Sequence, residues 1–451
     1  KSSNTTFVDK ELEEKTKNFS NFKSYNSFFK SRGVVIDQEK RKSFISNELI
    51  KLSNKKKLKI NLKKKLLEEI TNIVEKPKIL LCEFNKKYLM IPKEILIITM
   101  QNHQKYFPTF DNKEDLTNNF IVVADTKDPK GFVKLGNERV IEARLNDADF
   151  FWKRDKSQNL VKQVSKLKNI NYFKGLGSYF DKAQRIRKLC GLISDEILIS
   201  KEKIEIASSI CKVDLMSDLV GEFPELQGIM GGYFAESQGF DKDISLAVSE
   251  HYFPIGMDSI VPKKPYSVAL SISDKLDSLV GFFGIKLKPS SSKDPYALRR
   301  MAISLVRLII ENNKSFKLRE LINYSCLLYQ EQGLKFDTKL LQKDLSEFIL
   351  ERLKNYLKEK NIRNDIIESS TNTSNIDELL KIFKKSLALN KNIKKDFCQD
   401  VILIYKRSAN ILISAKQNSS EIIGSPDPGL FKNDFEKTLY KKINDIRKYF
   451  S

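Results

Sequence analysis

The segment from Cys211 to Gly232, CKVDLMSDLVGEFPELQGIMGG, constrains the fold more than any other part of the sequence. Apolar residues dominate the run from Val213 to Phe223, and Pro224 then blocks the continuation of a helix. The glycine pair that closes the segment permits backbone conformations that other residues rarely adopt. The segment therefore predicts a helix, a tight turn and the start of a second helix.

Four carboxylates lie within this segment: Asp214, Asp218, Glu222 and Glu225. In a continuous helix the first three, spaced i, i+4 and i+8, share one face. Such a stripe is typical of a metal or acid/base site, but it is more often a solvated helical surface. The sequence leaves both interpretations open.

The length and the charge of the chain limit the number of domains and the kinds of partner that can be expected. A chain of 451 residues is too long for one ordinary domain, so several domains are expected. Its formal net charge of +22 suits a polyanionic partner such as nucleic acid. Much of the excess is lysine in an Asn- and Ile-rich chain, which is also typical of AT-rich genomes. The lysine runs at 55–57 and 63–65 favour either RNA phosphate contacts or a solvated helical face.

Cysteine usage and hydropathy indicate the compartment. The five cysteines have no paired spacing, which predicts reduced, mostly buried thiols and no zinc site. No apolar run approaches the roughly 18 residues of a membrane span, so a cytoplasmic protein is expected. The chain starts at Lys1 rather than Met and stops at Ser451 after a helical pattern, which predicts a partial chain. The cysteines are Cys82, Cys190, Cys211, Cys326 and Cys398.

Local patterning predicts a multidomain, mainly α-helical protein with an α+β N-terminal part. Short apolar runs, KILLCEF, KYLMIP and FIVVAD, predict strands, whereas EILIITM suits either a strand or a helix. The pattern from 160 to 320 is almost wholly helical. The predicted parts are a lysine-rich helical region (1–75), a small α+β domain (76–160), a helical domain (161–315), a helical body (316–398) and a last segment (399–451).

The chain contains only two histidines, His103 and His251. His103 precedes Tyr106 and Phe107, which suit either the core of the α+β domain or stacking on a base. His251 falls at the predicted end of a helix, where a packed or capping role is commoner than a ligand role.

Two charged helices are also predicted. Charges of alternating sign over 136–155 favour a helix with i, i+4 ion pairs, anchored by the aromatic triplet 150–152. Asp294 and Pro295 predict an N-cap and a first helical position. Arg299 and Arg300 follow in the first turns, where they suit either phosphate contacts or pairing with acids of neighbouring helices.

Six longer motifs carry a family resemblance. They are LLEEITNIVEKPKIL, IPKEILIITMQNHQKYFP, GNERVIEARLNDADFFWKRD, CKVDLMSDLVGEFPELQGIMGGYF, SDKLDSLVGFFGI and KDPYALRR. With these motifs the chain resembles, over nearly its whole length, the beta subunit of the bacterial two-subunit glycyl-tRNA synthetase. Relative to that family it lacks the N-terminal portion and most of the C-terminal anticodon-binding domain, of which only 399–451 is expected.

The resemblance implies a division of labour. The alpha subunit holds the glycine and ATP site, with ATP and magnesium, while the beta subunit recognises glycine tRNA and completes a heterotetramer of two alpha and two beta subunits. This chain is then expected to bind no cofactor and to supply no catalytic residue. The implied RNA contacts are Lys406, Arg407 and Asn410 in a KR-x-x-N helix, followed by Arg299 and Arg300.

The family's helical core is also similar to the HD superfamily of metal phosphohydrolases, which implies a degenerate HD-like domain here. An HD site uses a histidine, an adjacent His-Asp pair and a distant Asp. The pair reads Val213-Asp214 and the last acid is Asp274, so the metal set is incomplete because valine is no ligand. The two acids are expected to accept hydrogen bonds within the fold or to contact tRNA.

Two alternatives remain open at this stage. One is an HD-type metal phosphohydrolase, and the other is a non-catalytic basic RNA-binding protein. A local departure from the family is the loop before Lys293, where Ser290-Ser291-Ser292 stands in place of the usual glycine and leaves the loop's backbone conformation open.

Overall fold

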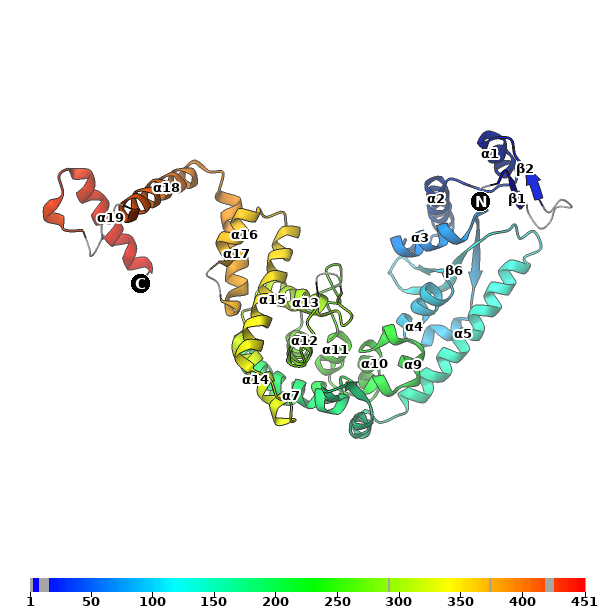
Figure 1. Cartoon of the computed structure of the whole chain (residues 1–451). Coiled ribbons are helices and arrows are strands. Elements are labelled where there is room, and N and C mark those ends of the chain that lie inside the picture. Colours follow the sequence, from blue (N-terminus) through cyan, green and yellow to red (C-terminus); the bar gives the residue numbers. More distant parts are fainter. Residues whose placement is uncertain (1–2, 8–15, 291–292, 373–374, 418–425, 451) are drawn as a thin grey trace. The chain divides into compact units, whose positions relative to one another are not determined.

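The computed structural model describes residues 3–7, 16–290, 293–372, 375–417 and 426–450 (Figure 1). These residues are mostly helical, with a small sheet towards the N-terminus, as the sequence predicts. They form two compact units: one runs to Tyr356 and includes 374–380, and the other contains 357–373 and 381 onward. The HD-like topology and the domain boundaries remain predictions.

The N-terminal part is built on a four-stranded antiparallel sheet with the strand order β3-β5-β6-β4. Its register pairs Ile79 with Val123 and Phe107 with Ile121. The elements are β1 (Thr5–Phe7), β2 (Thr16–Asn18), α1 (Phe22–Ser31), α2 (Gln38–Lys56), β3 (Lys59–Ile60), α3 (Lys64–Ile73), β4 (Lys78–Glu83), η1 (Lys86–Met90), α4 (Lys93–Ile98), η2 (Thr99–His103), β5 (Phe107–Phe110), β6 (Leu116–Ala124) and α5 (Phe132–Lys156).

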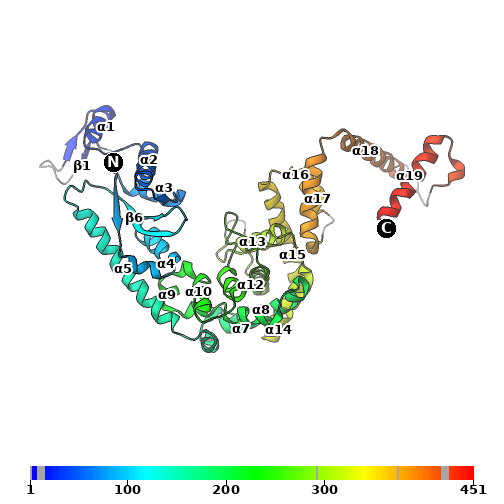
Figure 2. The ribbon, with the colours of Figure 1, turned by 180° about the vertical axis from the view of Figure 1, so that it is seen from behind.

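Helices cover both faces of this sheet (Figures 1 and 2). Because side chains alternate along a strand, Ile121 and Val123 of β6 face one side, where they share a core with α2 and α3. Phe120 faces the other side, and its ring stacks on Tyr106, whose hydroxyl donates to Asn137 of α5. The lysine-rich helices therefore share a core with the sheet.

The strand predictions are partly wrong. KILLCEF and FIVVAD are confirmed as β4 and β6, but KYLMIP forms the 3-10 helix η1 and EILIITM forms α4 and the start of the π-helical turn η2. Asn85 accepts a hydrogen bond from the Lys87 backbone N–H and so starts η1. Tyr106 and Phe107 are buried in the core, so they are not available for stacking on a base.

α5 confirms the charged helix predicted over 136–155. The i, i+4 ion pairs Lys134–Glu138 and Asp149–Lys153 lie along it. Of its aromatic triplet only Trp152 is buried, with its ring stacked on Phe234 of α10.

After α5, the described residues form helices and the turns between them, together with one short hairpin, β7–β8. The elements are α6 (Leu160–Gln163), η3 (Val164–Asn169), β7 (Asn171–Phe173), β8 (Gly177–Ser178), α7 (Tyr179–Ile197), α8 (Lys201–Ile210), η4 (Val213–Met216), α9 (Asp218–Glu222), η5 (Pro224–Leu226), α10 (Ile229–Ser237), α11 (Lys242–Glu250), α12 (Pro265–Gly284), α13 (Leu298–Glu311), α14 (Leu318–Glu331), α15 (Thr338–Glu359), α16 (Asn364–Thr371), η6 (Ile376–Glu378), α17 (Leu379–Asn392), α18 (Asp396–Gln417), η7 (Pro428–Leu430) and α19 (Asp434–Phe450).

α12 is the central helix of this part. It starts with Pro265 in its first turn and packs against α7, α8, α11, α13 and α14. Every residue from Ser267 to Gly284 is buried. A helix that is buried on all sides must satisfy its polar side chains inside the protein, so the charged residues of α12 need partners from the surrounding helices.

The predicted acidic stripe in the 211–232 segment is wrong. Ser217 adopts an extended conformation between η4 and α9, and its hydroxyl accepts a hydrogen bond from the Val220 N–H. Asp214 is therefore buried before this break, while Asp218 forms an exposed ion pair with Arg154 of α5. Serine and aspartate favour helix caps over helix interiors, and this local preference divides the predicted helix.

The second helix of that segment begins earlier than predicted. Gly228, at φ +82°, makes the turn, and the pair Gly231-Gly232 lies inside α10. These two glycines let α11 approach closely: a Cβ at Gly232 would lie 2.6 Å from the Ser249 Cβ and 2.8 Å from the Ser245 carbonyl oxygen.

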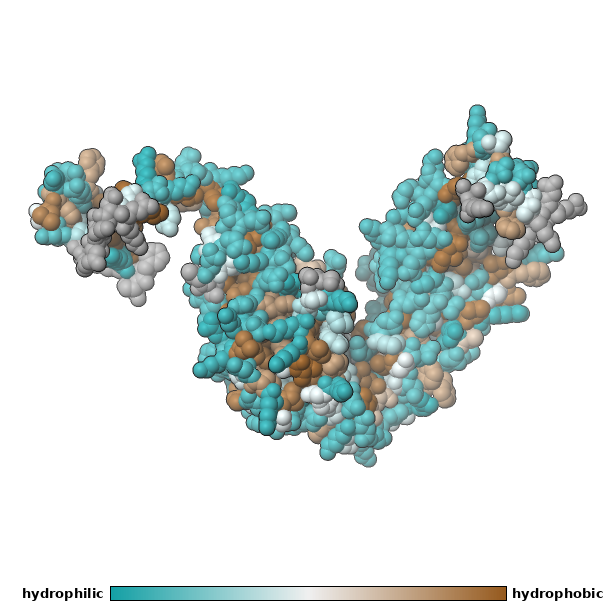
Figure 3. Space-filling model, in the orientation of Figure 1, coloured by the Kyte–Doolittle hydropathy of each residue, from teal (hydrophilic) through white to brown (hydrophobic). Residues whose placement is uncertain are grey.

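The surface and the thiols agree with the sequence. In the view of Figure 3 the surface is largely hydrophilic, with scattered hydrophobic patches. Four cysteines are buried and Cys398 is half-buried, as predicted, and burial raises the pKa of Cys82 to about 12. No helix in the described part of the chain is long and apolar enough to cross a membrane.

The contact between α10 and α11 makes a stability prediction. Gly232→Ala should lower the free energy of unfolding by about 1–3 kcal/mol, because the added methyl group meets the backbone of α11. Gly221→Ala in α9 is the matched control, since its Cβ would meet nothing within 4 Å and should be neutral or slightly stabilising. Urea unfolding midpoints measure both, and equal effects of the two substitutions would contradict the close approach.

A buried lysine and carboxylate cluster as the candidate functional site

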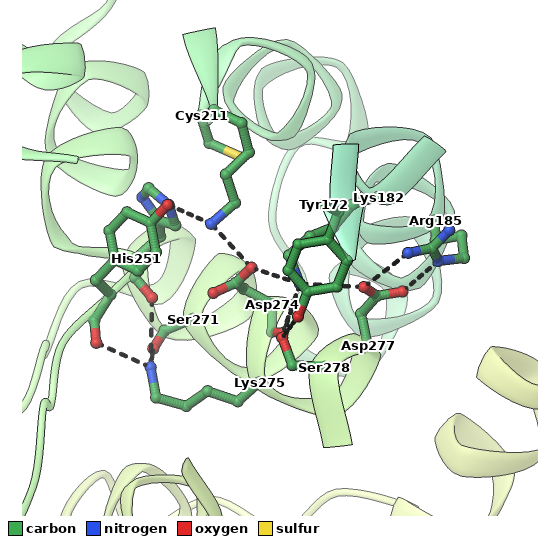
Figure 4. Close-up of polar contacts among 12 residues, drawn as sticks. Tyr172, Lys182, Arg185, Cys211, His251, Ser271, Asp274, Lys275, Asp277 and Ser278 are labelled. Atoms are coloured by element: carbon green, nitrogen blue, oxygen red, sulfur yellow. Dashed lines mark hydrogen bonds and ion pairs between the residues drawn. The ribbon is translucent and has the colours of Figure 1, made fainter. Parts of the chain in front are cut away.

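The candidate site forms around Asp274 at the middle of α12 (Figure 4). The Asp274 Oδ1 atom lies 3.1 Å from the Lys182 Nζ of α7 and 2.9 Å from the Lys212 Nζ, which follows α8. All three side chains are at least nine-tenths buried. One carboxylate oxygen therefore joins three segments of the chain.

A second ion pair lies one turn along the same two helices. The Arg185 Nε donates to the Asp277 Oδ1 at 2.6 Å, and the Lys182 Nζ lies 3.1 Å from the Asp277 Oδ2. The Arg185 guanidinium also lies 3.9 Å from the ring centroid of Tyr329, whose hydroxyl donates to the Asp277 backbone carbonyl at 3.0 Å. Because the basic pair on α7 and the acidic pair on α12 are both spaced i, i+3, the two faces match.

The charges within the cluster determine the protonation states of its lysines and of Asp274. Burial alone would lower the pKa of Lys212, but Asp274 outweighs it and the pKa is raised. Burial alone would raise the pKa of Asp274, but Lys182 and Lys212 hold that pKa below its ordinary value. These groups therefore stay charged at neutral pH.

Lys275, the next residue on α12, is different. Burial, together with the neighbouring charges of Lys212 and Lys182, lowers its pKa to about 7, against the opposing effect of Asp274. Its ammonium donates to the Ser271 Oγ at 2.8 Å and lies within 3.4 Å of the backbone carbonyl oxygens of residues 251–253.

His251 is fully buried and His103 is exposed, and neither lies in a metal-ligand set among the described residues. The His251 Nε2 lies 2.8 Å from the Lys212 Nζ and its Nδ1 lies 2.6 Å from the Val248 carbonyl oxygen, so a neutral ring accepts from the lysine and donates to the carbonyl. Burial and then Lys212 lower the pKa of His251 well below its ordinary value. The His103 ring stacks on Phe223 at 5.1 Å. The packed role predicted for His251 is confirmed.

Asp214 accepts hydrogen bonds at the start of α10. Its Oδ2 receives the backbone N–H groups of Gly228 and Gly231, where the helix leaves donors unpaired. Burial raises its pKa to about 6, with these two hydrogen bonds opposing the shift. This is a structural use of the carboxylate, one of the two roles that the sequence left open.

This donor set does not fit a metal ion. The Asp274 Oδ1 is shared by two ammonium groups, and Lys212 also engages the imidazole nitrogen of His251 that faces the cluster. Val213, at the position of the missing histidine, is buried and apolar. Among the residues that the structure describes, no group of three or more His, Cys, Asp or Glu side chains is placed to hold a metal.

The start of α13 departs from its prediction. The helix begins at Leu298, with Ala297 as its N-cap residue, so Pro295 precedes the helix rather than opening it. The Asp294 carboxylate still accepts the N–H groups of Leu298 and Arg299, because the turn before the helix folds back over its end. Ser291 and Ser292 lie outside the described residues.

The predicted RNA contacts fall in two different units. The Arg299 guanidinium donates to the Ser290 carbonyl oxygen, whereas Arg300 is exposed. The second set, Lys406, Arg407 and Asn410, is exposed on α18 of the other unit. Asp214 and Asp274 belong to the first unit. Asp274 raises the pKa of Lys212. Lys212 acts to lower the pKa of Asp214, against the larger effect of burial.

Sequence reasoning missed most of the cluster. It singled out Asp274 but gave no role to Lys182, Arg185 or Lys212. The i, i+3 spacing of Asp274 and Asp277 in SDKLD was the available signal, because two acids on a buried helix require cationic partners. The cationic partners of these acids come from helices about 90 residues away in the sequence. Lys182 and Asp274, for example, are 92 residues apart.

Comparison with known proteins identifies the family. Residues 1–372 match the family described as glycyl-tRNA synthetase beta subunit. The chain belongs to this family. It is similar to the glycine-tRNA ligase beta subunits of Thermodesulfovibrio yellowstonii (35% identity over 451 residues), Clostridioides difficile (35% over 449) and Rickettsia canadensis (34% over 448). These alignments cover 98 to 100% of the chain but 64% of each relative, so the chain spans just under two thirds of their length.

The Asp274 contacts predict a large cost for removing the carboxylate charge. Asp274→Asn should lower the free energy of unfolding by about 3–5 kcal/mol, because it leaves the buried Lys212 ammonium without its counter-charge and weakens the pairing of Lys182. Asp218→Asn, which breaks the half-exposed pair with Arg154, should cost less than about 1 kcal/mol. Denaturant unfolding compares the two, and similar costs would show that the buried ion pairs do not hold α7 and α12 together.

Lys275 predicts a pH dependence of stability. Its pKa rises from about 7 in the folded chain to about 10.5 in the unfolded chain, so between these values the unfolded state binds the extra proton. Stability should therefore increase with pH, by up to about 1.4 kcal/mol per unit. Measurements between pH 7 and about 7.8 limit the titration of unfolded thiols, whose ordinary pKa is about 8.5. Lys275→Met should remove this component, and an unchanged slope in the variant would contradict the lowered pKa.

Proposed function

We propose that this chain acts as the tRNA-binding beta subunit of a glycine-tRNA ligase. Membership of the glycyl-tRNA synthetase beta subunit family is the observation that carries the proposal. In the proposed enzyme an alpha subunit holds glycine, ATP and magnesium, and two alpha and two beta subunits form the active assembly. The reaction attaches glycine to its tRNA in the cytoplasm.

The exposed face of α18 supports an RNA contact. Lys406 and Asn410 are four residues apart and Arg407 adjoins the first, so the three side chains leave the same side of the helix. All three are exposed. The two cations suit phosphate oxygens, which position an RNA without reading its sequence, and the amide of Asn410 can both donate to and accept from a nucleotide.

Arg300 is a second proposed contact. It is exposed at the first turn of α13, whereas the neighbouring Arg299 is held by the Ser290 carbonyl oxygen. The held arginine fixes the end of the loop, and the exposed one remains available to a phosphate. Of the two arginines we therefore assign the direct contact to Arg300.

The chemistry of charging is proposed to lie outside this chain. The charged groups of the buried cluster form ion pairs with one another. Burial raises the pKa of the Cys190 thiol far above neutrality, so that thiol is protonated and a weak nucleophile. These side chains suit a rigid supporting body better than a nucleophile or a general base at neutral pH. The contribution of the subunit is then to bind and orient tRNA.

A charging assay tests the proposal. Full-length beta subunit and its alpha partner should charge glycine tRNA together, and neither should do so alone. Charging by the alpha subunit alone would contradict the proposal that this chain is a required subunit of the enzyme. Equal binding of all tRNAs without any need for the partner would instead favour a non-catalytic RNA-binding protein.

Salt dependence tests the α18 contacts. The double variant Lys406→Ala/Arg407→Ala should weaken tRNA binding and reduce the slope of log affinity against log salt by roughly 1.8, since each lost phosphate contact removes about 0.9. The control Lys339→Ala/Lys343→Ala removes the same charge from exposed positions of α15 and should leave the slope unchanged. An equal change in both variants would mean that only net charge matters.

A further inference from the structure

A cavity of about 350 Å³ adjoins the Asp274 cluster, and Lys182, Lys212 and Asp274 themselves form part of its lining. Side chains of β7, α7, α12, α13 and the segment after α11 line it, so it lies wholly within the first unit. Its volume lies at the lower end of the range for small-molecule sites. The tRNA contacts proposed above do not use this space, apart from Arg300 at its rim.

The lining is strongly unbalanced in charge. Four basic side chains face the cavity, and Asp274 is the one carboxylate among its lining residues. That carboxylate already shares its Oδ1 atom between two ammonium groups. The cavity therefore carries a net positive charge, which favours an anionic occupant. The basic residues are Lys182, Lys212, Lys275 and Arg300.

Several hydrogen-bond donors in the lining are uncommitted. The Lys212 Nζ forms an ion pair with Asp274 and a hydrogen bond with His251, which leaves one of its three N–H groups without a hydrogen-bond acceptor among the described residues. Within the part of the chain that the structure describes, no hydrogen bond is found for the Tyr179 hydroxyl or the Arg300 guanidinium. Lys182 and Lys275, by contrast, each have three or more acceptors. Three donors from α7, α13 and the end of α8 thus remain for a ligand.

The other walls are apolar or aromatic. The centroid of the Tyr252 ring lies 3.9 Å from the Lys212 Nζ, and Pro254, Ile255 and Met301 are also part of the lining. A ligand that suits the cavity has an anionic group at the Lys212 end and a flat or apolar body against these walls.

We propose that this cavity binds the phosphate monoester of a mononucleotide-sized ligand, with Arg300, Lys212 and Tyr179 holding the phosphate. A phosphate dianion accepts several hydrogen bonds at once, and arginine pairs with it through two parallel N–H groups. The base or sugar lies against Tyr252 and Met301. The phosphate is carried either by a free nucleotide or by the 5′ end of an RNA.

Direct binding tests the proposal without any charging reaction, so its failure is distinct from failure of the proposed function. Calorimetric titration of the full-length protein with AMP at low salt should give saturable binding. Adenosine should bind at least 10-fold more weakly, and inorganic phosphate should compete with AMP. Absence of AMP binding at millimolar concentrations, or equal binding of adenosine, would overturn the proposal.

Arg300→Gln is the informative variant because the side chain is exposed and the fold does not depend on it. It should weaken AMP binding at least 10-fold without changing the thermal unfolding midpoint. Arg319→Gln, the matched control, removes the same charge from an exposed arginine of α14 outside the lining and should leave AMP binding unchanged. Equal losses of AMP affinity in both variants would show that general surface charge accounts for the effect, and this would contradict the assigned site.

Tyr179→Phe tests the hydroxyl alone, with an expected loss of AMP affinity of about 3- to 10-fold.

A competition experiment decides the source of the phosphate. If 5′-phosphorylated RNA displaces AMP and 5′-hydroxyl RNA does not, the ligand is the end of an RNA. If neither displaces AMP, the ligand is a free nucleotide. Displacement by both RNAs alike would contradict recognition of a phosphate monoester.

Discussion

The helical part of this protein depends on one buried carboxylate shared by two ammonium groups. Asp274 of α12 holds Lys182 of α7 and Lys212 after α8, and each partner alone would be costly to bury. Each ammonium is paired with the shared carboxylate, so the arrangement of α7, α8 and α12 that brings the three groups together is favoured over registers that separate them. Apolar packing around α12 supplies the bulk of the stabilisation, and the charges restrict how the helices pack.

The sequence predicted the helices well because their signals are local. Apolar spacing and caps locate α7, α12 and α18, and strand runs locate β4 and β6. Predictions failed where short polar residues compete with the backbone. Ser217 breaks the expected acidic helix and Asn85 starts a 3-10 turn in a segment predicted as a strand. Such breaks depend on a single side-chain hydrogen bond, which apolar periodicity does not report.

The candidate site was predictable only in part. The resemblance drew attention to Asp214 and Asp274, but their partners come from distant segments, and no spacing in the sequence joins Lys182 to Asp274. The sequence also left open whether the two acids serve tRNA or the fold. The structure gives each a contact within the fold: Asp214 at the backbone of α10 and Asp274 at two lysines. RNA contacts on α18 stay a prediction, because exposed cations look alike with or without a ligand.

Lysines around Asp274 also decide what chemistry the site can support. A metal ion activates water because it is a concentrated charge with open coordination positions, whereas an ammonium group donates hydrogen bonds and leaves the pKa of water largely unchanged. With Lys212 bridging Asp274 and His251, the groups that would otherwise coordinate a metal are already paired. The remaining donors, on Lys212 and Arg300, attract an anion without activating a nucleophile. A cavity built in this way is suited to binding a phosphate and leaving it intact, which fits the proposed role of positioning RNA for chemistry performed elsewhere.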